Sequence, residues 1–330
     1  MTKLSPLLRF ILACWLCCFA SATIAQEEPA DAEDKLKAGH SAHGEAFNEG
    51  PRQAAYLMEG TGPISFEVTS DHPDVQKFVE QGIGQLHGFW YFEAERSFRQ
   101  AAMLDADCAI AYWGMAMANA GNSKRAKEFL AKAIERRSHA TEREAMYIDI
   151  LDHYHNGKGD KKAKAKEQIA RYEALAERYP DDLEAKAWVG YALYKNRSSA
   201  GKKYEEVDAA LKVVLAEEPL HPVHHYVIHL WDYKDAKKAL ESSAKCGNGT
   251  PAVAHMWHMP GHIYSRLKRY EDAVWQQEAS ARTDHAHMMR DRVLPDEIHN
   301  FAHNNEWLIR NLIYVGRWQD AIDLAKNMIE

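Results

Sequence analysis

The 330-residue chain has little of what usually marks a function. It holds five cysteines, and Cys14, Cys17 and Cys18 lie in a segment that we expect to be removed. The other two, Cys108 and Cys246, are too few for a disulfide framework, so we interpret them as small buried hydrophobic residues. There is no Gly-x-Ser-x-Gly, phosphate loop or His-Glu-x-x-His motif. A non-catalytic protein is therefore favoured over an enzyme.

A basic block and long apolar runs are also missing. The net charge is −7, and the Lys158–Lys166 run is diluted by Asp160. Phosphate neutralisation needs clustered Lys and Arg, so we expect no nucleic-acid partner. The run Phe10–Phe19 is too short to anchor the chain stably in a bilayer, and no other segment is a better candidate. We therefore expect no stable transmembrane anchor.

The N-terminus has the pattern of a secretory signal. Lys3 and Arg9 precede the apolar run, and Thr23 and Ala25 fit a cleavage site before Gln26. We predict a signal peptide over residues 1–25 and an exported protein, periplasmic or secreted. Lipid attachment at Cys14 is the disfavoured alternative. Residues 26–73 are predicted to be a flexible lead-in followed by an extended segment that packs against the first helices.

From residue 74 onward the sequence repeats a helical pattern. Gly82, Ala94, Phe98 and Ala101 form the small-residue skeleton of a tetratricopeptide (TPR) unit. Similar second helices are predicted to begin near Tyr233, Tyr270 and Trp318, with an inserted loop over residues 246–251. The pattern predicts an all-α, right-handed TPR-type solenoid of five to seven helix pairs over residues 74–330. We expect it to continue beyond a truncated C-terminus, because no capping helix follows.

The chain is rich in histidine, with 18 in total and 11 between His221 and His303. Three His-x-x-x-His pairs occur there, and a spacing of four places both rings on one helix face. Aligned on the repeat, these pairs fall on first helices, which line the concave wall of a TPR solenoid. Pro260 and Gly261 are predicted to kink or restart their helix. The candidate residues are His221, His225, His229, His255, His258, His262, His299 and His303.

Two functions follow from such a wall. The first is a scaffold that holds a peptide or partner protein in a His-rich concave groove. The second is a transition-metal protein or metal-dependent enzyme, because imidazole is a common ligand for zinc and copper. Nearby methionines such as Met256 and Met259 would suit copper(I). The sequence leaves both readings open.

Several sequence segments resemble those of a known protein family. The stretch His87–Ala102, the run Ala111–Gly114 and the segments His225–His229 and His258–Tyr264 resemble a group of secreted or periplasmic bacterial TPR proteins. The likeness runs from about Gly44 to the end. It implies an exported all-helical solenoid and transfers no settled activity. The irregular repeat spacing and the short unit 109–140 depart from the general pattern.

Overall fold

The computed structural model describes residues 54–295, 298 and 300–329. The predicted signal peptide and the lead-in up to residue 53 lie outside these ranges. All described residues belong to one compact unit. The α-helices of this part are α2 (Pro73–His87), α3 (Tyr91–Leu104), α4 (Ala109–Ala118), α5 (Ser123–Glu135), α6 (Glu142–Asn156), α7 (Lys161–Arg178), α8 (Leu183–Ala200), α9 (Tyr204–Glu217), α10 (His224–Trp231), α11 (Leu240–Gly249), α12 (Ala254–Arg266), α13 (Tyr270–Asp291), α14 (Phe301–Tyr314) and α15 (Trp318–Asn327). Short 3-10 helices are η2 (Arg137–His139) and η3 (Ala236–Ala239).

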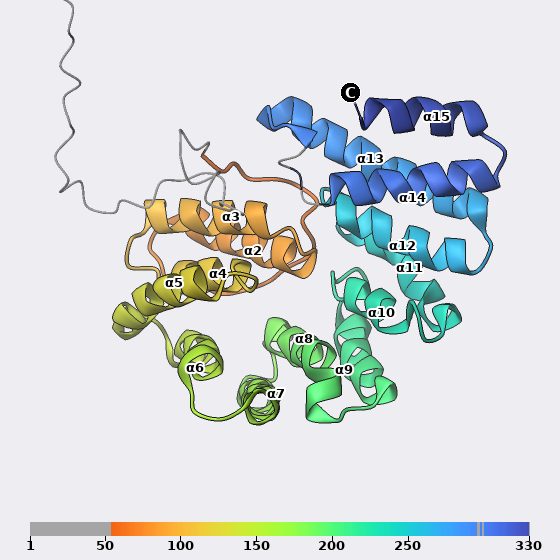
Figure 1. Ribbon diagram of the computed structural model, residues 1–330. Coiled ribbons are helices and arrows are strands. Elements are labelled where there is room, and N and C mark those ends of the chain that lie inside the picture. Colours follow the sequence, from red (N-terminus) through yellow and green to blue (C-terminus); the bar gives the residue numbers. More distant parts are fainter. Residues whose placement is uncertain (1–53, 296–297, 299, 330) are drawn as a thin grey trace, which may run out of the picture. The chain divides into compact units, whose positions relative to one another are not determined.

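The helices pack in chain order. Each contacts the next, and α2 with α4, α4 with α6, α10 with α12 and α12 with α14 also touch. Figure 1 shows this side-by-side arrangement at α12, α13 and α14. The fourteen described α-helices, taken two at a time, make seven sequential pairs, the upper end of the predicted five to seven. The described chain contains no strand, so the all-α prediction is confirmed for this part.

Local sequence sets where several helices begin and end. Thr141 caps α6, its hydroxyl accepting from the Glu144 N–H while the Glu144 carboxylate accepts from the Thr141 N–H. Asp182 caps α8 by accepting from the Ala185 N–H. Gly201 ends α8 in the left-handed conformation, with φ of 73°. These are the residue types that the ends of helices favour.

Phe98 joins the first two helix pairs. Its ring is fully buried between Gly82 of α2 and Gly114 of α4. A Cβ at Gly82 would lie 2.7 Å from the ring, and one at Gly114 would lie 2.3 Å from it. The missing side chains make room for the ring, as the small-residue skeleton predicts.

The described part of the N-terminal segment, residues 54–72, is non-helical and lies against several helices. The Met58 N–H donates to Gln81 Oε1 at 2.6 Å, and the Thr69 N–H donates to Glu144 Oε1 at 2.8 Å. Phe66 is 1% exposed and packs on Tyr147 with ring centroids 5.2 Å apart. The segment thus ties α2 to α6.

The first helices also contact helices much later in the chain. The Ala252 N–H, just before α12, donates to the Gly60 carbonyl at 2.9 Å. Arg96 of α3 donates to Asp291 of α13 at 3.1 Å, across 195 residues of sequence. These hydrogen bonds therefore tie the beginning of the described chain to the region of α12 and α13.

Three local predictions can be compared with these helices. Helices α13 and α15 begin at Tyr270 and Trp318 as expected, but the helix expected from Tyr233 begins as η3 and continues as α11. The predicted loop 246–251 is wrong over residues 246–249, because α11 runs to Gly249. That glycine serves close packing, since a Cβ there would lie 2.3 Å from the Leu220 carbonyl oxygen.

Helix α12 continues through Pro260, so the predicted restart does not occur. The helix packs between α11 and α13, and those contacts offset the lost backbone hydrogen bond. Among the described residues, none of the helices combines the length and apolar character needed to cross a bilayer.

Candidate metal centre

The structure describes seven of the eight predicted histidines, and His299 lies outside the described residues. Each of the seven belongs to a group of three residues whose ligand atoms lie within 4.8 Å of one another. We call His225, His229 and His255 the first cluster, His258, His262 and His303 the second cluster, and His87, Glu184 and His221 the third cluster. The predicted histidines therefore separate into three sets.

The first cluster joins helices α10 and α12. His225 and His229 lie one turn apart on α10, and His255 lies in the first turn of α12. His225 Nδ1 lies 2.7 Å from the carbonyl oxygen of His87. Because a carbonyl only accepts, Nδ1 carries the proton and Nε2 keeps a lone pair. The ring is thus held in the tautomer that leaves Nε2 able to bind a metal ion.

Three nitrogen atoms of the first cluster are buried without a hydrogen-bond partner among the described residues. They are Nε2 of His225, Nε2 of His229 and Nδ1 of His255. Buried polar atoms are normally paired, and each unpaired one costs about 1–3 kcal/mol. Three such atoms converging on one point are therefore typical of a place where an ion binds.

The rings of the first cluster are neutral. Burial, with a smaller contribution from His262, lowers the pKa of His229 to about 4. Burial, then the neighbouring imidazoles, lowers the pKa of His225 and of His255 well below the usual value. A metal ion binds the neutral imidazole, so protons compete weakly here at neutral pH.

The second cluster joins α12 and α14. Gln277 Nε2 donates to the His258 carbonyl at 3.1 Å, which fixes the amide so that Oε1 faces His258 Nδ1 at 2.6 Å. Nδ1 of His258 therefore carries the proton. His262 Nδ1 lies 3.3 Å from a carboxylate oxygen of Asp232, so it is also the protonated nitrogen.

The consequence is a close approach of two lone pairs. Nε2 of His258 and Nε2 of His262 lie 2.7 Å apart. With both Nδ1 atoms protonated, either an extra proton or a metal ion must lie between the two Nε2 atoms. His303, which is exposed on α14, completes this group.

The third cluster differs because its members satisfy one another. Glu184 accepts from His87 Nε2 at 2.8 Å and from His221 Nε2 at 2.9 Å. The Tyr226 hydroxyl donates to His87 Nδ1, and the Val223 N–H donates to His221 Nδ1. Burial alone would raise the pKa of Glu184, but His221 and His87 outweigh it and lower the pKa to about 2. We interpret this cluster as a structural network, so His221 does not join the other candidate ligands.

A pocket of about 290 Å³ reaches the first cluster. His229 lines it together with Phe89, Tyr194, Arg197 and Tyr204. Phe89 adopts a φ of 56°, rare for a bulky residue, and its ring centroid lies 4.4 Å from that of His225. Phe89 therefore covers the cluster on one side, while the pocket gives access to His229.

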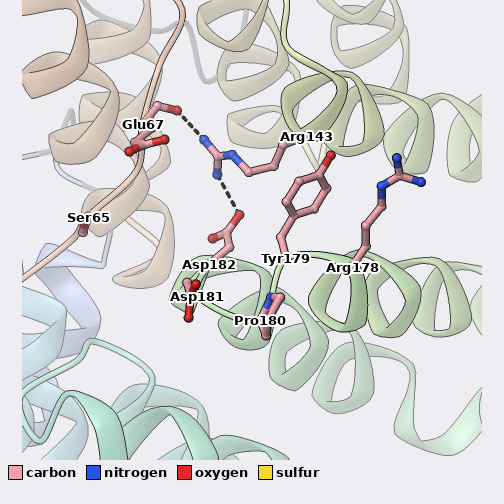
Figure 2. A pocket seen from close by; sticks show the side chains of 8 residues that line it. All are labelled: Ser65, Glu67, Arg143, Arg178, Tyr179, Pro180, Asp181 and Asp182. Carbon is pink, nitrogen blue, oxygen red and sulfur yellow. Dashed lines mark hydrogen bonds and ion pairs between the residues drawn. The ribbon is translucent and has the colours of Figure 1, made fainter.

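A second pocket, of about 380 Å³, lies elsewhere and is lined by charged residues (Figure 2). Arg143 donates to Asp182 at 2.6 Å and also to the Glu67 carbonyl oxygen. Its guanidinium lies 4.4 Å from the Phe66 ring centroid. These contacts hold the N-terminal segment against α6 and the start of α8. We therefore interpret the residues that line this pocket as stabilising the fold.

Several important residues have no signal in the sequence. His87 and Glu184 are 97 residues apart in the sequence. Asp232 and Gln277 hydrogen-bond to the second cluster but do not belong to its two helices. Only contact in the folded chain identifies them. Met256 lies in the hydrophobic core with its sulfur 4.0 Å from that of Cys246.

No protein-family model matches the chain, and no curated protein matches it.

Proposed function

We propose that this chain is a transition-metal-binding protein and that one ion binds at the first cluster. The ligands are Nε2 of His225, Nε2 of His229 and Nδ1 of His255. The observation that carries the proposal is the convergence of these three buried atoms, which have no partner among the described residues. The neutral state of the rings supports it. The hydrogen bond from His225 Nδ1 to the His87 carbonyl oxygen also supports it, because metal-bound histidines usually donate their other N–H to such a group.

The donor set favours zinc or copper. All three ligands are imidazole nitrogens, which suit zinc, copper, nickel and iron, and copper(II) binds such ligands most strongly. Nitrogens bound at about 2.0–2.1 Å around a tetrahedral ion lie about 3.4 Å from one another. The ligand atoms here lie within 4.8 Å, so binding would draw the rings inward. Three protein ligands leave one position open, on the side where the pocket reaches His229.

The fold and location that we propose follow from the sequence and from the helix pairs. Sequential pairing and the Phe98 ring seated between two glycines support a right-handed TPR-type solenoid. The N-terminal pattern supports export. Peptide or partner-protein binding by the histidines stays a prediction. It is weakened because His225 and His258 are fully buried and so cannot touch a peptide without rearrangement.

Zinc binding by the full chain tests the proposal. His229→Gln and His255→Gln are suitable variants because both rings are only partly buried, and His139→Gln on the exposed η2 turn is the matched control. Equilibrium dialysis followed by elemental analysis should show that each cluster variant binds one zinc ion fewer than wild type, with circular dichroism unchanged. Binding equal to wild type in both cluster variants would refute the assignment.

A further inference from the structure

We infer that the first and second clusters form one dinuclear copper centre. This inference rests on the proposed function, since it adds a second ion beside the first. Each half would have the same composition, with a His-x-x-x-His pair from one helix and a third histidine from another. The pairs are His225 with His229, and His258 with His262, and the third ligands are His255 and His303.

Helix α12 brings the two halves together. It supplies His255 to the first cluster and His258 to the second, and these residues are three positions apart, about 4.5 Å along the helix axis. Their rings stack with centroids 5.7 Å apart and planes inclined by 23°. Ligands of the two halves therefore stack on each other.

In the second half, two nitrogen lone pairs face each other, and an ion bound to both would hold them together. Nε2 of His258 and Nε2 of His262 face each other at 2.7 Å, while Gln277 and Asp232 hold the opposite nitrogens. An ion bound at about 2.0–2.1 Å to each Nε2 would separate them to about 3.4 Å and remove the lone-pair repulsion. The exposed His303 ring, with its centroid 4.9 Å from that of His258, can close over such an ion.

The donor set favours copper. All six ligands are imidazoles, and Asp232, the carboxylate beside His262, is also paired with Arg266. Imidazole suits copper, and copper(II) exceeds zinc in affinity for such ligands.

Copper loading with electron paramagnetic resonance tests the pairing. The full chain is saturated with copper(II), and bound copper is compared with the integrated spin. Wild type should bind two copper ions per chain and show magnetic coupling, as lost intensity or a half-field signal. His303→Gln and His229→Gln should each bind one copper with full intensity and an isolated spectrum, and the control His139→Gln should behave as wild type.

The outcomes separate this inference from the proposed function. One copper in wild type that is lost in His229→Gln would overturn the pairing and leave the single site standing. Two copper ions with additive, uncoupled spectra would also overturn the pairing. Absence of bound copper and zinc in wild type would overturn both.

Discussion

Nε2 of His258 lies 2.7 Å from Nε2 of His262, with Asp232 and Gln277 facing the opposite nitrogens of the two rings. Each ring is thereby held with its Nε2 lone pair toward the other. Two facing lone pairs repel each other unless a proton or a metal ion lies between the rings. Asp232 and Gln277 hold the rings in this orientation, so replacing either residue should change the affinity for metal.

Replacing Asp232 by Asn should weaken the second site. The amide cannot hold the His262 N–H as strongly as the carboxylate, and loss of such a supporting group typically lowers metal affinity about 10–100-fold. Competition titration with a chromophoric chelator measures this, and the first site should be unaffected. The control is Asp235→Asn, at an exposed residue that follows α10. Equal affinity in both variants would contradict the role of Asp232.

Replacing Glu184 by Gln should destabilise the fold without removing metal. The amide nitrogen would face one of two imidazole N–H groups and leave it unpaired, at a cost of about 1–3 kcal/mol in the free energy of unfolding. Urea unfolding measures the loss, and Glu217→Gln, at an exposed residue of α9, is the control. A folded Glu184→Gln protein that has lost a metal ion would show that the third cluster also binds metal.

Replacing Gly114 by Ala should destabilise the first two helix pairs. The new Cβ would lie 2.3 Å from the buried Phe98 ring, and such overpacking typically costs about 1–3 kcal/mol. Gly121→Ala is the matched control, because nothing lies within 4 Å of a Cβ built there. Thermal unfolding compares the two. A Gly114→Ala protein as stable as Gly121→Ala would contradict the close packing at Phe98.

The buried carboxyl of Asp284 should make stability fall as pH rises. Burial raises its pKa from 3.8 to about 7, partly opposed by the hydrogen bond from Asn304. Between these values the unfolded chain releases a proton that the folded chain keeps, so stability is full below pH 3.8 and declines up to about pH 7.

Asp284→Asn should remove this dependence. At about one pKa unit per 1.4 kcal/mol, it should gain up to about 4 kcal/mol over wild type at pH 8 and little at pH 4. Urea unfolding at both pH values, with exposed Glu271→Gln of α13 as control, measures the difference. A difference from wild type that does not change with pH would rule out titration of Asp284 as its cause.

The sequence predicts part of this arrangement well. A spacing of four on a helix places His225 with His229 and His258 with His262, and both pairs do lie on α10 and α12. Gly82 and Phe98, which belong to the predicted small-residue skeleton, likewise pack against each other, because such signals are local and recur along the chain.

Other features depend on the folded chain. His255 joins the α10 pair although it is on α12, since the two helices pack against each other. His221 belongs with His87 and Glu184, whose sequence positions give no hint of a meeting. Gly247 and Gly249 predict a loop, yet they allow close packing against Trp257 of α12 and the Leu220 backbone. Tertiary contact decides each of these cases.

The most direct test of the metal site is anomalous X-ray diffraction from crystals of the chain grown with zinc or copper, recorded on both sides of the metal's absorption edge. We expect an anomalous peak about 2.0–2.1 Å from His225 Nε2, His229 Nε2 and His255 Nδ1. Anomalous density confined to other residues, or its absence at this point under saturating metal, would contradict it.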